Sequence, residues 1–132
     1  MERRSYQLSA IVADDDPDLA SVLCELLQIG GVNVIGVGHN GKEAVDLYEK
    51  LRPDVVFLDI MMPKFDGFYA LKNIRLINKN AKVLMITAND SVKTVMRCSE
   101  LGAMAYVEKP FDFNKLQAAI TATFQEYMPH SN

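Results

Sequence analysis

The sequence predicts an α/β fold: a doubly wound (βα)5 arrangement with a five-stranded parallel sheet in the order 2-1-3-4-5 and helices on both faces. Apolar runs of strand length alternate five times with segments of helical periodicity, and such alternation gives a parallel sheet covered by helices. Five strands are too few for an eight-stranded barrel, so an open sheet remains. We expect a single domain over residues 1–132, with its core at about 8–127.

The first strand–helix unit is marked by a proline and a glycine pair. The apolar run 8–13 predicts a strand, and Pro17 behind Asp16 can open a helix, because proline is favoured at the first helical position. Gly30, followed by a second glycine, ends that helix. Apolar residues at helical spacing predict its inward face: Leu19, Val22, Leu23, Leu26 and Leu27.

The second and third units follow the same plan. The run 32–37 predicts a strand, and the next helix begins at Asn40 and stops before Pro53. The run 55–58 is wholly apolar, as expected of a central parallel strand, and a loop ending near Gly67 leads to the third helix. The predicted inward residues are Ala44, Val45, Tyr48 and Leu51 in one helix and Leu71, Ile74 and Ile77 in the other.

The last two units complete the alternation. The run 82–86 predicts the fourth strand, Ser91 can cap the helix after it, and Gly102 follows that helix. The run 104–107 predicts a short fifth strand, and Asp112 can cap the last helix. The fourth helix carries the apolar residues Val92, Val95 and Met96, and one stripe of the last helix carries Leu116, Ala119, Ile120, Thr123 and Phe124.

Composition and charge exclude several classes of function. With a net charge of −3 and a pI of about 5.3, nothing favours direct contact with nucleic acid or an anionic membrane surface. No apolar run approaches the roughly 18 residues of a membrane span, and the first residues lack a signal-peptide core. Cys24 and Cys98 lie apart, without the spacing of a metal or redox motif, which is typical of reduced thiols. We expect a cytoplasmic protein.

Aspartates directly follow two of the predicted strands. Asp14 and Asp15 come after the run 8–13, and Asp59 comes after the run 55–58. In the order 2-1-3-4-5 the strand order reverses between strands one and three, and ligands bind there, beyond the carboxyl ends. Two unit charges about 5 Å apart repel by roughly 3 kcal/mol at an effective dielectric near 20, so these acids need a cation or a proton. Carboxylates in a water-accessible site suit Mg²⁺.

Two further polar residues end strands and must reach the same edge. Thr87 follows the fourth apolar run, and Lys109 follows the fifth. Acids, a cation site, a hydroxyl and an ammonium are the groups needed to handle a phosphoryl group. No Walker A, GxGxxG or HExxH sequence is present, so nothing in the sequence predicts a nucleotide cradle.

Taken together, these residues resemble the receiver domain of two-component response regulators, a chemotaxis-regulator-like domain with a flavodoxin-like fold. The resemblance extends from about Leu8 to Tyr127, and the joint pattern is specific although no single part of it is. The matching motifs are Asp14-Asp15, Asp59 followed by Met62-Pro63 and Asp66-Gly67, Thr87-Ala88, and Lys109-Pro110-Phe111.

The resemblance implies a role for each matching residue. Asp59 would take a phosphoryl group from a sensor histidine kinase and become an aspartyl phosphate. Asp14, Asp15 and Asp59 would hold Mg²⁺, with the backbone carbonyl of Met61 as a further ligand. Lys109 would pair with the phosphoryl oxygens.

The resemblance also implies a switch. Thr87 would hydrogen-bond to a phosphoryl oxygen, and the ring of Tyr106 would turn into the space that Thr87 leaves. The face of the fourth helix, fifth strand and fifth helix would then repack and control a downstream partner or output domain. The Lys109-Pro110 bond matches a place where the family often has a cis peptide.

Two residues near the predicted site depart from the pattern of some family members, and two other functions fit the sequence less well. Met61 and Asn89 stand two residues after Asp59 and Thr87, and an apolar Met61 offers the attacking water no hydrogen bond, so we expect slow self-dephosphorylation. A Mg²⁺-dependent phosphohydrolase with an aspartyl nucleophile would need a second acid where Met61 stands. A flavodoxin-like cofactor binder would need a phosphate loop where the three acids stand. We expect a signalling domain and no enzyme beyond its own phosphotransfer and autodephosphorylation.

The remaining polar residues near these motifs have simpler interpretations. Asp16 is expected to cap a helix, and Asp66 is expected to set the turn before Gly67. His39 and His130 have no partner in the pattern that would make them ligands or bases. The arginines that support dimerisation in one transcription-factor subfamily are absent after Lys-Pro-Phe, so we expect a monomer. The last residues lack linker composition, which favours a stand-alone regulator over a receiver cut from a longer one.

Overall fold

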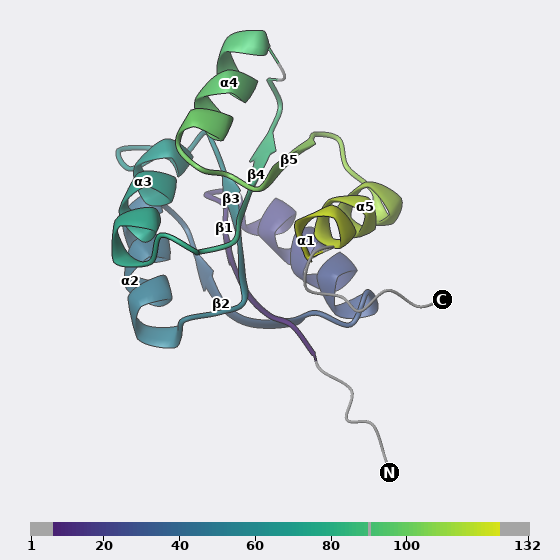
Figure 1. Ribbon diagram of the computed structural model, residues 1–132. Coiled ribbons are helices and arrows are strands. Elements are labelled where there is room, and N and C mark those ends of the chain that lie inside the picture. Colours follow the sequence, from purple (N-terminus) through teal and green to yellow (C-terminus); the bar gives the residue numbers. More distant parts are fainter. Residues whose placement is uncertain (1–6, 90, 125–132) are drawn as a thin grey trace.

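The computed structural model describes residues 7–89 and 91–124, whose five strands form one parallel sheet in the order β2-β1-β3-β4-β5 (Figure 1). The predicted fold class and strand order are therefore confirmed. The elements in chain order are β1 Ser9–Ala13, α1 Pro17–Ile29, β2 Asn33–Gly38, α2 Gly41–Leu51, β3 Val55–Asp59, α3 Gly67–Ile77, β4 Val83–Thr87, α4 Val92–Glu100, β5 Ala105–Glu108 and α5 Phe113–Phe124.

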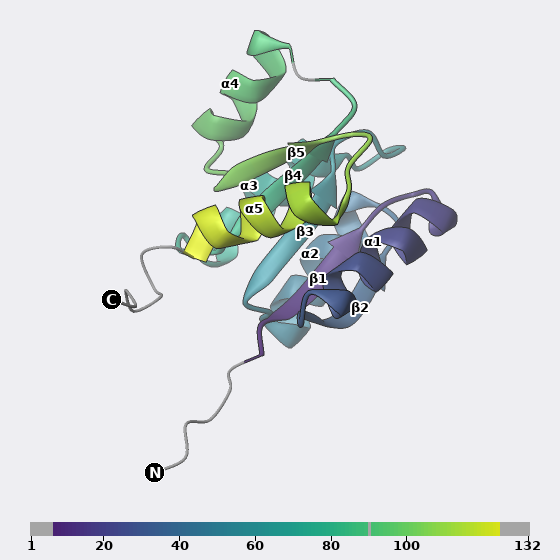
Figure 2. The same cartoon turned by 90° about the vertical axis from the view of Figure 1, so that its right-hand side faces the viewer.

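Helices cover both faces of the sheet and divide the apolar core in two. In Figures 1 and 2, α1 and α5 lie on one face and α2 and α3 on the other. Successive residues of β3 point to opposite faces, so Phe57 packs with Leu23 of α1 while Leu58 packs in the core that contains Ile74 of α3. β3 and β4 are buried along their whole lengths, which explains why the third run is wholly apolar.

Short polar side chains begin the helices at the predicted places. The carboxylate of Asp16 accepts from the N–H groups of Asp18 and Leu19, and that of Asp66 accepts from the N–H of Tyr69. Both residues are therefore helix caps. The same role is filled by Asn40 before α2, Ser91 before α4 and Asp112 before α5.

The inward face of α1 differs from the prediction. Leu19 and Val22 are exposed, and the buried residues are Ala20, Leu23 and Leu27. A helix on a sheet buries a narrow stripe, and α5 is the helix packed beside α1. The flank that carries Leu19 and Val22 therefore faces solvent, which the periodicity of the sequence did not reveal.

The apolar residues of α4 are also more exposed than their spacing predicts. Val92 is 74% exposed and Met96 is 55% exposed, whereas Val95 is half-buried and Cys98 is buried. In Figures 1 and 2, α4 stands out beyond β4 and β5, so only a thin stripe of the helix reaches the protein. The pattern of apolar residues correctly predicted a helix, but the prediction that Val92 and Met96 face inward was wrong.

Some sequence predictions lie outside the described residues. These are the end of the core at Tyr127 and His130 in the C-terminal segment. Within residues 7–89 and 91–124, no helix is both long and apolar enough to cross a membrane.

Candidate functional site

Three carboxylates gather at the carboxyl edge of the sheet. Asp59 is the last residue of β3, while Asp14 and Asp15 directly follow β1. One carboxylate oxygen from each of these residues lies within 4.8 Å of the others. Asp14 and Asp59 are buried, and Asp15 is exposed. The cluster is therefore closed on the protein side and open to water on the other.

The register of the sheet produces this cluster. Ala13 of β1 pairs with Leu58 of β3, so the next residues, Asp14 and Asp59, emerge side by side where the strand order reverses. The N–H of Asp14 donates to the carbonyl of Gly38 at 3.1 Å. Oδ1 of Asp14 accepts from the N–H of Asp16 at 2.9 Å. These two hydrogen bonds fix the backbone and the side chain of Asp14.

The ammonium of Lys109 lies between the two buried acids. Its Nζ is 3.3 Å from Oδ1 of Asp59 and 3.8 Å from Oδ2 of Asp14. The N–H of Lys109 donates to the carbonyl of Thr87 at 2.7 Å, which holds the chain after β5 against the end of β4. The Lys109-Pro110 peptide bond is cis, as the resemblance implies. One cation shared by two carboxylates offsets only part of their repulsion.

This environment raises the pKa of Asp59 from 3.8 to about 6. Burial is the largest cause because it disfavours the charged form, and the negative charge of Asp14 adds to it. The positive charge of Lys109 and its hydrogen bond act in the opposite direction and lower the pKa of Asp59. Ionised Asp59 is thus held at an energetic cost, which a bound cation would reduce.

The raised pKa predicts that Asp59→Asn stabilises the fold at neutral pH. An acid whose folded pKa exceeds its unfolded value contributes stability that is complete below about pH 3.8 and is lost as the pH rises through about 6. At pH 8 in EDTA we expect the free energy of unfolding of the variant to exceed that of the wild type by about 1–2 kcal/mol. Each pKa unit corresponds to about 1.4 kcal/mol before solvent screening. The difference should shrink toward pH 4. Urea unfolding at several pH values measures it, and a constant difference across pH would contradict it.

Thr87 and Tyr106 extend the site toward β5. Thr87 is buried at the end of β4, and its hydroxyl donates to the carbonyl of Asn89 at 2.8 Å and accepts from the N–H of Asn89 at 2.9 Å. The ring of Tyr106 is 42% exposed, on the strand that pairs with β4. In this structure the hydroxyl of Thr87 is therefore engaged by its own loop, and Tyr106 points outward.

Two neighbours of the site, Gly67 and His39, were only partly seen or missed in the sequence. Gly67 begins α3 so close to β3 that a Cβ there would lie 2.4 Å from the carbonyl oxygen of Asp59, so only glycine fits. Nδ1 of His39 lies 3.4 Å from the carbonyl oxygen of Asp14, and the backbone N–H of His39 donates to the carboxylate of Glu43. The Asp-Gly turn was a visible signal for Gly67, but nothing in the sequence indicated the position of His39.

The donor set fits a hard divalent cation. Carboxylate oxygens that converge at a partly open edge are the ligands that Mg²⁺ accepts while it keeps several waters. The side chain of Met61 is exposed at the start of the loop after β3, and its backbone carbonyl stays a predicted ligand. Acids, an ammonium and a nearby hydroxyl can together bind and neutralise a phosphoryl group.

The acids, the ammonium and the hydroxyl thus lie together where the strand order of a doubly wound sheet reverses. The sequence model of one protein family, the response regulator receiver domain, matches residues 10–121. The chain therefore belongs to this family. Receiver domains of two-component systems are signalling domains rather than typical enzymes, and the hydrolase alternative is not favoured.

Relatives and solved structures agree with this assignment. The chemotaxis protein CheY of Thermotoga maritima is 33% identical over 110 residues, which is 83% of this chain and 92% of that protein. The transcriptional regulatory protein CpxR of Escherichia coli K12 is 42% identical over 112 residues, but these are only 47% of its length. A chain in the crystal structure of a CheX-CheY-BeF3-Mg²⁺ complex from Borrelia burgdorferi superposes with a TM-score of 0.86 at 34% identity and 89% coverage of both chains.

Proposed function

We propose that this chain accepts a phosphoryl group on Asp59 from a sensor histidine kinase and passes the signal to a downstream partner in the cytoplasm. The observation that carries the proposal is the buried Asp59 carboxylate, which lies against Asp14, Asp15 and Lys109. A carboxylate that is partly stripped of water and shares one ammonium with a second acid is poised to react with an electrophile when a cation offsets the surrounding charge.

The transfer itself needs few protein groups. An oxygen of Asp59 forms a bond to phosphorus as the bond from phosphorus to the imidazole nitrogen of the donor phosphohistidine breaks, and that nitrogen takes up a proton. Lys109, 3.3 Å from Asp59, neutralises charge on the phosphoryl oxygens. The hydroxyl of Thr87 then becomes a donor to one of those oxygens.

Asp14, Asp15, Asp59 and the carbonyl of Met61 would hold the Mg²⁺. When bound, this ion supplies positive charge that offsets the roughly −1.5 to −2 charge of the new phosphate. The protein holds the three carboxylates together, and Lys109 favours the deprotonated form of Asp59 against the effects of burial and Asp14.

Phosphorylation is proposed to act on the face of α4, β5 and α5. To reach the phosphoryl group, Thr87 must give up both hydrogen bonds to Asn89, and the exposed ring of Tyr106 can then turn inward. Val92 and Met96 of α4 and Met104, directly before β5, are exposed apolar residues on this face. The rearrangement is a population shift toward the form that the partner binds.

The proposal is tested with acetyl phosphate as a small phosphodonor. In Mg²⁺ we expect one phosphoryl group per chain, detected by intact mass and lost on treatment with hydroxylamine, as an acyl phosphate is. EDTA should prevent the reaction. A hydroxylamine-stable adduct, or labelling that is unaffected by EDTA, would overturn the proposal.

Met61→Asn is expected to shorten the lifetime of the phosphorylated form several-fold. Met61 is exposed beside the path of an attacking water and offers it no hydrogen bond, whereas an asparagine amide can orient that water. The measurement is the decay of the acyl phosphate after removal of the donor. A decay that is unchanged or slower in the variant would contradict the expectation.

A further inference from the structure

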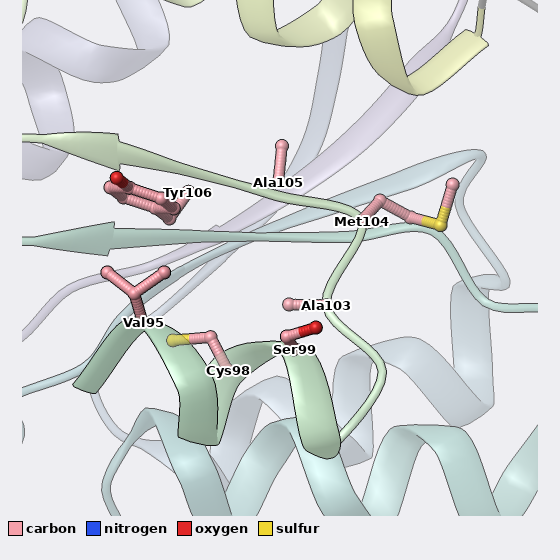
Figure 3. A pocket seen from close by; sticks show the side chains of 7 residues that line it. All are labelled: Val95, Cys98, Ser99, Ala103, Met104, Ala105 and Tyr106. Atoms are coloured by element: carbon pink, nitrogen blue, oxygen red, sulfur yellow. The ribbon is translucent and has the colours of Figure 1, made fainter. Parts of the chain in front are cut away.

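Helix α4 is attached to the rest of the protein through few side chains. Among its nine residues, all of which are described, only Cys98 is buried. A groove of about 360 Å³ separates the helix from β5, and Figure 3 shows Val95 and Cys98 of α4 on one side and Tyr106 on the other. A helix with so little buried surface and open space beneath it can shift at small energetic cost.

One end of α4 is held by the site itself. The hydroxyl of Thr87 both donates to and accepts from the backbone of Asn89, and Oδ1 of Asn89 accepts from the N–H of Ser91, the cap of α4. A hydroxyl that turns toward a phosphoryl group on Asp59 would break the two bonds to Asn89. Phosphorylation would therefore loosen the start of α4.

A second contact of α4, made by Arg97, involves neither Thr87 nor Asn89. The guanidinium of Arg97 lies over the ring of Phe68, with 4.2 Å between the guanidinium carbon and the ring centroid. Phe68 is the second residue of α3, next to Gly67, whose backbone lies against the carbonyl of Asp59. Arg97 thus ties a loosely packed helix to a rigidly placed one.

We propose that the Arg97–Phe68 contact is a latch that keeps α4 in its unphosphorylated position and so sets how much phosphoryl binding energy the switch requires. This inference rests on the proposed function, because it concerns the regulation of the same switch. A cation stacked on a ring at an exposed site changes an equilibrium by about two- to five-fold. Loss of the latch should make the switch easier to operate by the same factor.

Cys98 reports the position of α4. Its thiol is buried in the groove wall, and burial raises the pKa of Cys98, so both access and reactivity are low while the helix is in place. In a Cys24→Ser background, labelling by N-ethylmaleimide then reads out Cys98, because these two are the cysteines of the chain.

The decisive variant is Arg97→Met, with Lys93→Met as its matched control. Both remove an exposed cation from α4, but of these two residues only Arg97 is stacked on a ring. The charge of Arg97 also lowers the pKa of the Cys98 thiol, so labelling is followed as a function of pH, which separates ionisation of the thiol from access to it. Without phosphodonor, we expect Cys98 to label about two to five times faster in Arg97→Met and at the wild-type rate in Lys93→Met. An unchanged rate in Arg97→Met, or an equal rise in Lys93→Met, would overturn the latch.

A second measurement connects the latch to the switch. In the wild type with Mg²⁺, beryllofluoride should change the Cys98 labelling rate, and its half-saturating concentration should fall about two- to five-fold in Arg97→Met. The same concentration in both proteins overturns the latch. Absence of any beryllofluoride response in the wild type would instead refute the proposed function.

A double-mutant cycle assigns the effect to the pair. Phe68→Leu keeps most of the apolar volume in the core but removes the ring, and Arg97→Met should not lower the half-saturating beryllofluoride concentration any further in that background. Additive effects of the two substitutions would show that they act separately, and would overturn the latch.

Discussion

Asp59→Asn is expected to abolish acceptance of a phosphoryl group from acetyl phosphate. The amide is nearly the same size as the carboxylate, but it lacks the charged oxygen that would form the bond to phosphorus. The rate of labelling should fall at least about a hundredfold, to the level of side reactions. Intact mass after incubation with donor and Mg²⁺ measures the loss.

Asp66→Asn is the matched control for that loss. Asp66 caps α3 next to the same loop, and asparagine caps a helix about as well as aspartate does. This variant should be labelled at the wild-type rate. The two proteins should also be folded, since Asp59→Asn is expected to be more stable than the wild type at neutral pH. Undiminished labelling of Asp59→Asn would remove Asp59 from the role of phosphoacceptor.

Replacing Asp14 and Asp15 by asparagine is expected to remove the dependence of the reaction on Mg²⁺. The two carboxylates lie within 4.8 Å of Asp59, and hard divalent cations bind weakly where one carboxylate replaces three. Labelling in saturating Mg²⁺ should fall to the rate that the wild type shows in EDTA. The measurement is the labelling rate against Mg²⁺ concentration.

Asp16→Asn separates that effect from a general loss of acidic charge. Asp16 belongs to the same run of three aspartates, yet its carboxylate accepts from the backbone at the start of α1 instead of joining the cluster. Its Mg²⁺ dependence should equal that of the wild type. A full Mg²⁺ response in the Asp14→Asn/Asp15→Asn protein would place the metal elsewhere.

Removing the charges of Asp14 and Asp15 should also lower the pKa of Asp59 in the Asp14→Asn/Asp15→Asn variant. Asp14 is the second largest cause of the raised pKa of Asp59, and Asp15 contributes in the same direction. Loss of both charges leaves Lys109 as the nearest charge, so the pKa of Asp59 should fall toward 3.8. Slow labelling of this variant at neutral pH would then reflect the missing cation and not protonation of Asp59.

The positions of the helices and strands could be predicted because their signals are local. Proline, glycine and capping residues sit at fixed places relative to a helix start or end, and Asp16, Asp66 and Ser91 fill these places in the structure. The faces that the helices bury were predicted less well. Leu19, Val22 and Met96 have helical spacing but lie on flanks that no element in the described part of the chain covers.

The chemistry at the sheet edge could be listed from the sequence, but its energetics could not. Strand ends placed Asp14, Asp59, Thr87 and Lys109 at one edge because parallel strands end together. The distance from Lys109 to each acid depends on a hydrogen bond from its backbone to Thr87, which joins residues far apart in the chain. The raised pKa of Asp59 depends on those distances and on burial.

The order of the elements and the sheet edge where the acids meet could be read from the amino-acid sequence, because they follow from the period of apolar residues and from where each strand stops. The burial of Asp59 but not of Asp15, and the stacking of Arg97 on Phe68, became visible only in the folded chain. Burial and stacking depend on how separate elements pack, and no short stretch of sequence contains both partners.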